Sequence, residues 1–156
     1  MKHTCLLLPL LVLGNGPAVP APSVPAPSVP AAATTVTVDI TGLRNTRGLV
    51  HVCMTASTKA FPEGCAKDPG HRAATIKAGD PPTLVLRDVA PGRYAIVLLH
   101  DENANRKMDK MLFLPKEGFG FSRDAPVRMG PPKFDAAAFE VTGAKPLRMT
   151  MKVRYM

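Results

Sequence analysis

Apolar and polar residues alternate at both ends of the chain, and this pattern constrains the fold more than any other feature. In TTVTVDITG, Val36, Val38 and Ile40 share one side of an extended chain. In LRMTMKVRY, the apolar residues between Leu147 and Tyr155 share one side, and Arg, Thr and Lys residues share the other. Successive side chains of a β-strand point to opposite faces, so each segment is predicted to be a strand with one buried face.

Further short apolar stretches lie between these two segments and are separated by Pro and Gly turns. The stretches LVHVCMT (49–55), TIKA (75–78), TLVLRDV (83–89), RYAIVLLH (93–100) and AAFEVTG (137–143) each predict a strand. No segment longer than a turn has convincing helical periodicity. We therefore expect an all-β fold, an immunoglobulin-like or transthyretin-like antiparallel β-sandwich of about 6–7 strands.

One tyrosine is predicted to be structural. A Pro-Gly turn leads directly into the strand that contains Tyr94. In β-sandwiches, a tyrosine at such a corner hydrogen-bonds to the backbone a few residues upstream. We expect the Tyr94 hydroxyl to make this bond.

The first residues have the composition of an export signal. Lys2 precedes the apolar run LLLPLLVL (6–13), which is too short to span a bilayer. We expect a signal peptide over residues 1–18, although a later cleavage near Ala31 also fits the sequence. The protein is then expected to be exported, to the periplasm or the extracellular space, with no transmembrane segment after the signal is removed.

The expected linker is rich in proline and alanine and covers residues 19–33. Proline at this density favours an extended, semi-rigid tether. A single β-sandwich domain is expected over residues 34–156.

The cysteine count predicts a disulfide. Of the three cysteines, Cys5 lies in the expected signal peptide, directly before the apolar run, which leaves Cys53 and Cys65. An even pair in an oxidising compartment usually forms a disulfide, which stabilises a loop of this size by about 3 kcal/mol. A redox pair or half of a zinc site is disfavoured, because the spacing is far from C-x-x-C and no second ligand pair stands at zinc spacing.

The stretch HDENANRKMD (100–109) is the strongest candidate for a site. It carries oxygen-bearing side chains at alternating positions, followed by a further carboxylate, and the nearest outside carboxylate is Glu117. The candidate ligands for Ca²⁺ are therefore Asp101, Asn103, Asn105, Asp109 and Glu117. The alternative is that Asp and Asn side chains only cap their own backbone in Asx-turns. The incoming strand and the Arg at the sixth loop position distinguish the stretch from an EF-hand.

Catalytic machinery is not indicated elsewhere. His100 and Asp101 are neighbours on a strand and point to opposite faces, so they do not orient each other. Ser122 lacks the G-x-S-x-G elbow. The sequence favours a non-enzymatic binding or structural module. The alternative is a metal-dependent hydrolase in which Asp101 and Glu117 hold a metal that activates water.

Charge and aromatic content narrow the expected partners. The chain has a formal net charge of +8, which attracts polyanions, but no arginine-rich helix or run of basic and aromatic residues is present. We expect no nucleic-acid function, and an anionic envelope polymer, a peptide or a glycan as partner. Phe119 and Phe121, in a Gly-rich stretch, are a candidate recognition loop, or else they plug the end of the sandwich.

Several blocks of sequence together resemble a known family. They are GLRNTRGLV, the F-P pair at Phe61 and Pro62, the P-G-x-Y-A turn, HDENANRKMD, PKEGFGFS and GPPKFDAAAFEV. In this order, from Val36 to Tyr155, they resemble a bacterial family of exported proteins, domain of unknown function 2141. The resemblance implies a secreted or periplasmic β-sandwich without assigned activity. Similar proteins typically have glycine where this chain has Ala104 and Arg106, and larger residues there restrict the backbone.

Overall fold

The computed structural model describes residues 32–111, 114–143 and 145–156 of the 156-residue chain. The expected signal peptide lies outside the described residues, and so does the expected linker up to residue 31. Among the described residues, no helix has the length and apolar character needed to cross a membrane.

The described chain is built almost entirely from strands. The long strands are β1 (Thr34–Thr41), β2 (Leu49–Thr55), β3 (Arg72–Lys77), β4 (Thr83–Val89), β5 (Gly92–Asp101) and β10 (Leu147–Lys152). The shorter strands are β6 (Lys110–Met111), β7 (Leu114–Pro115), β8 (Gly118–Phe121) and β9 (Phe139–Val141). The helical pieces are single turns: η1 (Cys65–Lys67), η2 (Ser122–Asp124) and α1 (Phe134–Ala137).

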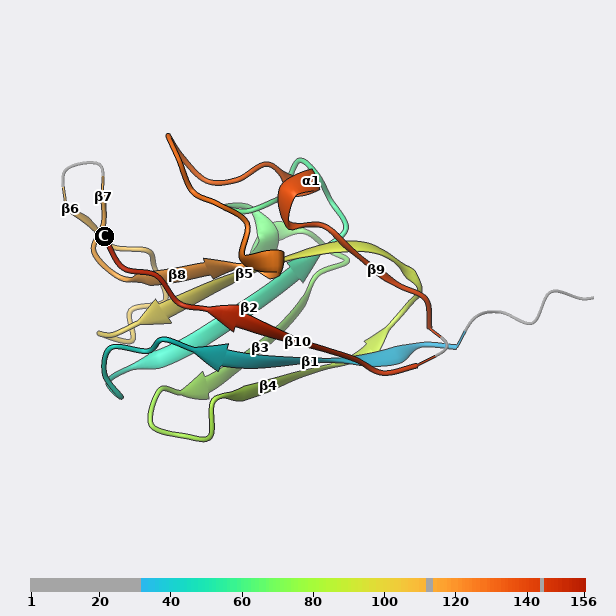
Figure 1. Ribbon diagram of the computed structural model, residues 1–156, viewed down its shortest axis with the longest axis horizontal. Coiled ribbons are helices and arrows are strands. Elements are labelled where there is room, and N and C mark those ends of the chain that lie inside the picture. The colour runs from blue at the N-terminus through green and yellow to red at the C-terminus, as the bar shows by residue number, and fades with distance from the viewer. Residues whose placement is uncertain (1–31, 112–113, 144) are drawn as a thin grey trace, which may run out of the picture.

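The strands form two layers. One sheet has the order β10-β1-β4. The other has five strands: β3-β2-β5-β8 follow in this order and are called the four-stranded sheet below, and β9 is a fifth strand that pairs with β5 (Figure 1). The short strands β6 and β7 form a separate hairpin. The all-β sandwich expected from the sequence is therefore confirmed.

The pairing of the first and last long strands adds a detail that the sequence pattern did not contain. β1 and β10 are parallel, while the other pairs among the described strands are antiparallel. In an immunoglobulin constant-type domain the first two strands belong to the same sheet. Here β1 and β2 lie in different sheets, so the strand order differs from that of an immunoglobulin constant-type domain.

The main core lies between the sheets. Val36, Val38 and Ile40 of β1 are buried, as the alternation predicted, and they pack with Val50 and its neighbours from the opposite sheet. Burying a side chain of this size stabilises the fold by roughly 1.5–3 kcal/mol. The inner faces of the two sheets therefore pack against each other and form the main core.

A second apolar cluster lies on the outer face of the four-stranded sheet. Its buried members are Phe61, Ala95, Phe119, Phe121, Ala125, Phe134, Ala137 and Ala138. In Figure 1 the segment that carries η2 and α1 lies on this side of the sheet, away from β1. This segment covers only part of the outer face.

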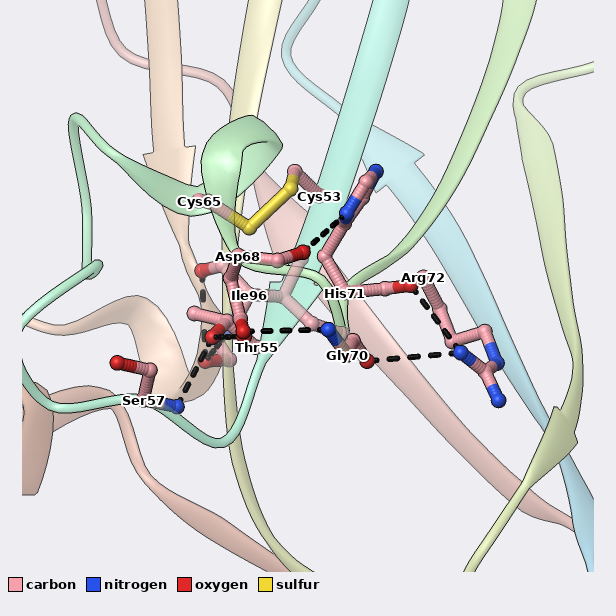
Figure 2. Close-up of a disulfide and its surroundings, with 10 residues drawn as sticks. Cys53, Thr55, Ser57, Cys65, Asp68, Gly70, His71, Arg72 and Ile96 are labelled. Carbon is pink, nitrogen blue, oxygen red and sulfur yellow. Dashed lines mark hydrogen bonds between the residues drawn. A yellow bond between two sulfur atoms is a disulfide. The ribbon is translucent and has the colours of Figure 1, made fainter.

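Two expected local contacts are present. The Tyr94 hydroxyl donates a hydrogen bond to the Ala90 carbonyl oxygen at 3.0 Å, which confirms the predicted tyrosine corner. Cys53 of β2 and Cys65 of η1 form the predicted disulfide, with a Cα–Cα distance of 6.1 Å (Figure 2).

Candidate functional site

A groove with a volume of about 1130 Å³ lies on the outer face of the four-stranded sheet. Its floor consists of alternate residues of β2, β3, β5 and β8, because the intervening residues point into the main core. The floor residues are His51, Cys53, Ala73, Thr75, Val97, Leu99, Phe119 and Phe121. Two of them, Phe119 and Phe121, are the aromatics of the expected recognition loop, and they are 4% and 5% exposed.

Loops form the walls of the groove. One wall comes from the segment around Pro62 and Ala66, another from the β6–β7 hairpin, and a third from residues 127–131. Among the described residues, four large hydrophobic side chains are exposed, and three of them line this groove. These three are Leu114, Met129 and Met156, which are 58%, 104% and 57% exposed. Clustered exposed apolar side chains around a hollow are typical of a binding surface.

The disulfide region supports the first wall. Asp68 accepts hydrogen bonds from the Thr55 hydroxyl and from the Gly70 amide, the latter at 3.2 Å (Figure 2). The Thr55 hydrogen bond, followed by that of Gly70, holds the pKa of Asp68 below its ordinary value of 3.8. Together with the bond between Cys53 and Cys65, these contacts tie the loop after β2 to the sheet.

The charged side chains that line the groove are mostly cationic. They are Arg106, Lys110, Arg128 and Glu63. Lys110 and Glu63 are 3.8 Å apart, so they partly neutralise each other. The two arginines are exposed and make no ion pair with a described residue. The rim therefore carries excess positive charge.

The loop after β5 brings the candidate metal ligands into one hydrogen-bond network. The Asp101 carboxylate is fully buried and accepts the backbone amides of Asn105 and Arg106 at 3.1 and 2.6 Å. The Asp109 carboxylate accepts the side-chain amide of Asn103 at 2.7 Å and that of Asn105 at 3.0 Å. The side-chain oxygens of Asn103 and Asn105 accept backbone amides two residues ahead. These are the contacts of Asx-turns.

Two residues of this loop have backbone angles that favour glycine. Ala104 and Arg106 have φ of 58° and 62°. This left-handed region is open to glycine and strained for other residues. The chain therefore keeps the loop conformation while carrying larger residues there.

Glu117 is the least satisfied member of the network. It is 4% exposed, and its Oε2 accepts the Asp109 backbone amide at 3.2 Å. Its Oε1 is buried and has no hydrogen-bond partner among the described residues. Burial, together with the negative charges of Asp101 and Asp109, raises the pKa of the Glu117 carboxyl above its ordinary value of 4.5.

Glu117 and Asp109 also line a small second pocket of about 170 Å³. The other lining residues are Arg44, Arg47, Glu102, Asn103 and Lys116. Across the described residues, no group of three or more His, Cys, Asp or Glu side chains is gathered closely enough to hold a metal ion. A cation in this loop would therefore need the Asn side chains and the backbone as additional ligands.

One pair of functional groups was missed from the sequence. His51 Nε2 lies 3.3 Å from the Asp101 Oδ2, and His51 Nδ1 lies 2.8 Å from the Thr75 hydroxyl oxygen. The pairing crosses three strands, so only the register of β3, β2 and β5 brings these residues together. His–Asp pairs occur in general acid–base catalysis, and the same contacts also satisfy polar side chains on a sheet.

His100, which precedes Asp101 in the sequence, belongs to the interior. It is fully buried, with Nδ1 2.6 Å from the Tyr155 hydroxyl and Nε2 2.9 Å from the Arg47 carbonyl oxygen. Both ring nitrogens are therefore occupied by structural contacts.

Comparisons with known proteins identify the family and little beyond it. A family model described as "Uncharacterized protein conserved in bacteria (DUF2141)" matches residues 38–149. A search of curated proteins finds no matching relative. Two solved structures of a pilus-presented adhesin, Cpa, align with 80% and 81% of this chain, at 12% and 11% identity and TM-scores of 0.32 and 0.33. The chain spans 28% and 27% of those adhesin chains, and at these TM-scores no property of the adhesin transfers to it.

Proposed function

Because the chain belongs to the DUF2141 family of uncharacterised bacterial proteins, we propose that it is an exported, non-enzymatic module that binds its ligand in the groove beside the four-stranded sheet. The disulfide between Cys53 and Cys65 is compatible with export to an oxidising compartment. In this proposal the sandwich is a rigid scaffold and the loops around the groove select the ligand.

The observation that carries the proposal is the unpartnered apolar surface of the groove. Exposed apolar side chains are scattered singly on most proteins, but here Leu114, Met129 and Met156 gather around one hollow. Phe119 and Phe121 then contribute to the floor rather than to a freely exposed loop.

A neutral polarity-sensitive dye tests whether the groove binds apolar ligands. We expect Nile red to bind the oxidised, exported protein saturably, and we expect Leu114→Glu and Met129→Glu to weaken this binding. The matched control is Val85→Glu, because Val85 is an exposed apolar residue on the other sheet. Absence of saturable binding, or equal weakening by the control, would overturn the proposal.

A specific observation also favours a cation in the loop after β5. The buried Glu117 Oε1 has no partner among the described residues, and it lies in a network with Asp101 and Asp109. A Ca²⁺ ion would supply the missing partner and would neutralise part of the repulsion among the carboxylates. Because basic residues flank these carboxylates, we expect binding only at high micromolar to millimolar concentrations, as in extracellular calcium modules.

The experiment for the cation is thermal unfolding in EDTA and in millimolar Ca²⁺, with Mg²⁺ as the matched ion. We expect a rise in Tm with Ca²⁺ that Asp109→Asn reduces. An equal rise in Tm in the variant would mean that Ca²⁺ binds outside this loop.

The hydrolase alternative requires a metal with one coordination position open to substrate. Asp101 and Glu117 are 0% and 4% exposed. The pocket beside Glu117, at about 170 Å³, is smaller than the roughly 300–1,000 Å³ of typical small-molecule sites. This favours an enclosed structural cation over a catalytic one. Metal-dependent hydrolysis of a p-nitrophenyl ester that Glu117→Gln abolishes would favour the hydrolase instead.

A further inference from the structure

We propose that the ligand of the groove is a free single-chain amphiphilic anion, an alkyl chain that ends in a carboxylate. The chain would lie along the apolar floor, and the carboxylate would face the cationic rim. This inference rests on the proposed function of the groove and requires no cation in the loop after β5.

The floor offers apolar contact and few free polar groups. Val97, Leu99 and Phe119 present hydrocarbon to the groove, and Cys53 is consumed in the disulfide. The polar floor residue His51 is already occupied on both ring nitrogens, by Thr75 and Asp101. A ligand body rich in hydrogen-bonding groups would find few partners there and would lose those of water.

The size of the groove suits an extended chain. The floor crosses four strands, which at about 4.8 Å per strand spacing is roughly 14 Å. The volume of about 1130 Å³ slightly exceeds the range of roughly 300–1,000 Å³ in which small ligands are usually bound. The groove can therefore accommodate an alkyl chain together with some water.

The mouth of the groove combines flexible apolar side chains with positive charge. Met129 and Met156 are unbranched and adapt to irregular apolar ligands. Arg106 and Arg128 make no ion pair with a described residue, so their guanidinium groups are available to an anionic head. A guanidinium matches a carboxylate by paired hydrogen bonds. Charge complementarity thus selects an anionic amphiphile over a cationic or a neutral one.

Isothermal titration calorimetry with octanoate, decanoate and dodecanoate, all below their micellar concentrations, tests the proposal. A fully buried methylene strengthens binding by up to about fourfold, so two further carbons tighten Kd by up to about fifteenfold. We expect dodecanoate to bind most tightly and dodecyltrimethylammonium, with the same chain length, to bind at least several-fold more weakly.

Charge reversal at the rim tests the role of the arginines. We expect the double variant Arg106→Glu, Arg128→Glu to weaken dodecanoate by about three- to tenfold and to reduce the preference for the anion. The control is Arg87→Glu, an exposed arginine on the other sheet, which should leave Kd within about twofold. A double variant that binds dodecanoate as the native protein does would overturn the role of the rim.

The outcomes separate this inference from the proposed function. If Nile red binds but dodecanoate does not, or binds without chain-length dependence, the groove is a binding site and the ligand class is wrong. If neither binds, both proposals fail. Binding to anionic vesicles without binding to monomeric dodecanoate would identify a membrane surface instead. Self-association that Met129→Glu abolishes would identify a second copy of the chain as the occupant.

Discussion

Replacing Glu117 with glutamine distinguishes two effects of this residue: the destabilisation of the fold by its buried carboxylate and its proposed role as a ligand of Ca²⁺. In the native protein its Oε1 is buried without a partner among the described residues, and a buried unsatisfied polar atom costs about 1–3 kcal/mol. The raised pKa of Glu117 reports the same cost, because burial and the neighbouring carboxylates disfavour its ionised form. Glutamine keeps the shape, removes the charge and supplies an NH₂ donor near acidic side chains. We therefore expect Glu117→Gln to be about 1 kcal/mol more stable than the native protein in EDTA.

Calcium should reverse this order. With a Kd of about 1 mM and 10 mM Ca²⁺, a single site adds about 1.4 kcal/mol to the free energy of unfolding. The variant lacks one carboxylate ligand, so Ca²⁺ should raise its free energy of unfolding by less. In Ca²⁺ the native protein should therefore be at least as stable as the variant.

Equilibrium urea unfolding in EDTA and in CaCl₂, followed by far-UV circular dichroism on oxidised protein, measures both effects. The control is Glu140→Gln, because the Glu140 side chain is 67% exposed and the exchange should change stability by less than about 0.5 kcal/mol. A loss of 1 kcal/mol or more for Glu117→Gln in EDTA would refute the reasoning, since it would mean that the carboxylate is well satisfied. Equal stabilisation of both proteins by Ca²⁺ would refute the assignment of the ion to this loop.

Three further predictions concern the scaffold. The disulfide closes a loop between cysteines with a sequence separation of 12. Removing it by Cys53→Ala and Cys65→Ala should lower the free energy of unfolding by about 3 kcal/mol in urea titrations. Reduction of the native protein should reproduce this loss. Burial raises the pKa of Glu102, but hydrogen bonds from Arg and Asn side chains outweigh it, so its pKa lies below 4.5. Its stabilisation is therefore present above pH 4.5 and is lost as the pH falls through the lowered pKa, and Glu102→Gln should flatten the acid limb of Tm against pH. Tyr94→Phe removes the hydrogen bond to Ala90 and should cost about 0.5–1.5 kcal/mol, with unchanged Nile red binding.

The parts of the fold that the sequence predicted correctly are those that depend on local spacing. The alternation around Val36 determines which face of β1 is buried, because side chains on a strand have a period of two. The hydrogen bond of Tyr94 was predictable because a Pro-Gly turn directly precedes its strand, and the disulfide was predictable because only two cysteines remain after the expected signal peptide. The parallel pairing of β1 with β10 joins segments more than 100 residues apart, and no local pattern specifies it.

The site was predictable only in part for the same reason. Its oxygen-bearing side chains are close in sequence, and the structure indeed gathers Asp101, Asn103, Asn105, Asp109 and Glu117 in one network. The direction of each side-chain amide depends on Asx-turn geometry, which spacing does not reveal. The groove exists because β5 is apolar on both faces: Ile96 and Leu98 point into the main core, and Val97 and Leu99 line the groove. The sequence predicted a strand there, but it did not indicate that loops leave the outer face partly uncovered.

Asp101 connects the two regions that the proposals treat separately. Its Oδ1 and Oδ2 accept the amides that fold the loop after β5, and Oδ2 also lies 3.3 Å from His51 in the floor of the groove. Replacing Asp101 would therefore disturb loop order, the candidate cation site and the groove floor at once. A loss of ligand binding in an Asp101 variant could not distinguish a structural effect from either proposal. Glu117 is hydrogen-bonded to the loop and does not line the groove, whereas Arg128 lines the groove and not the small pocket, so variants at these two positions separate the cation from the amphiphile.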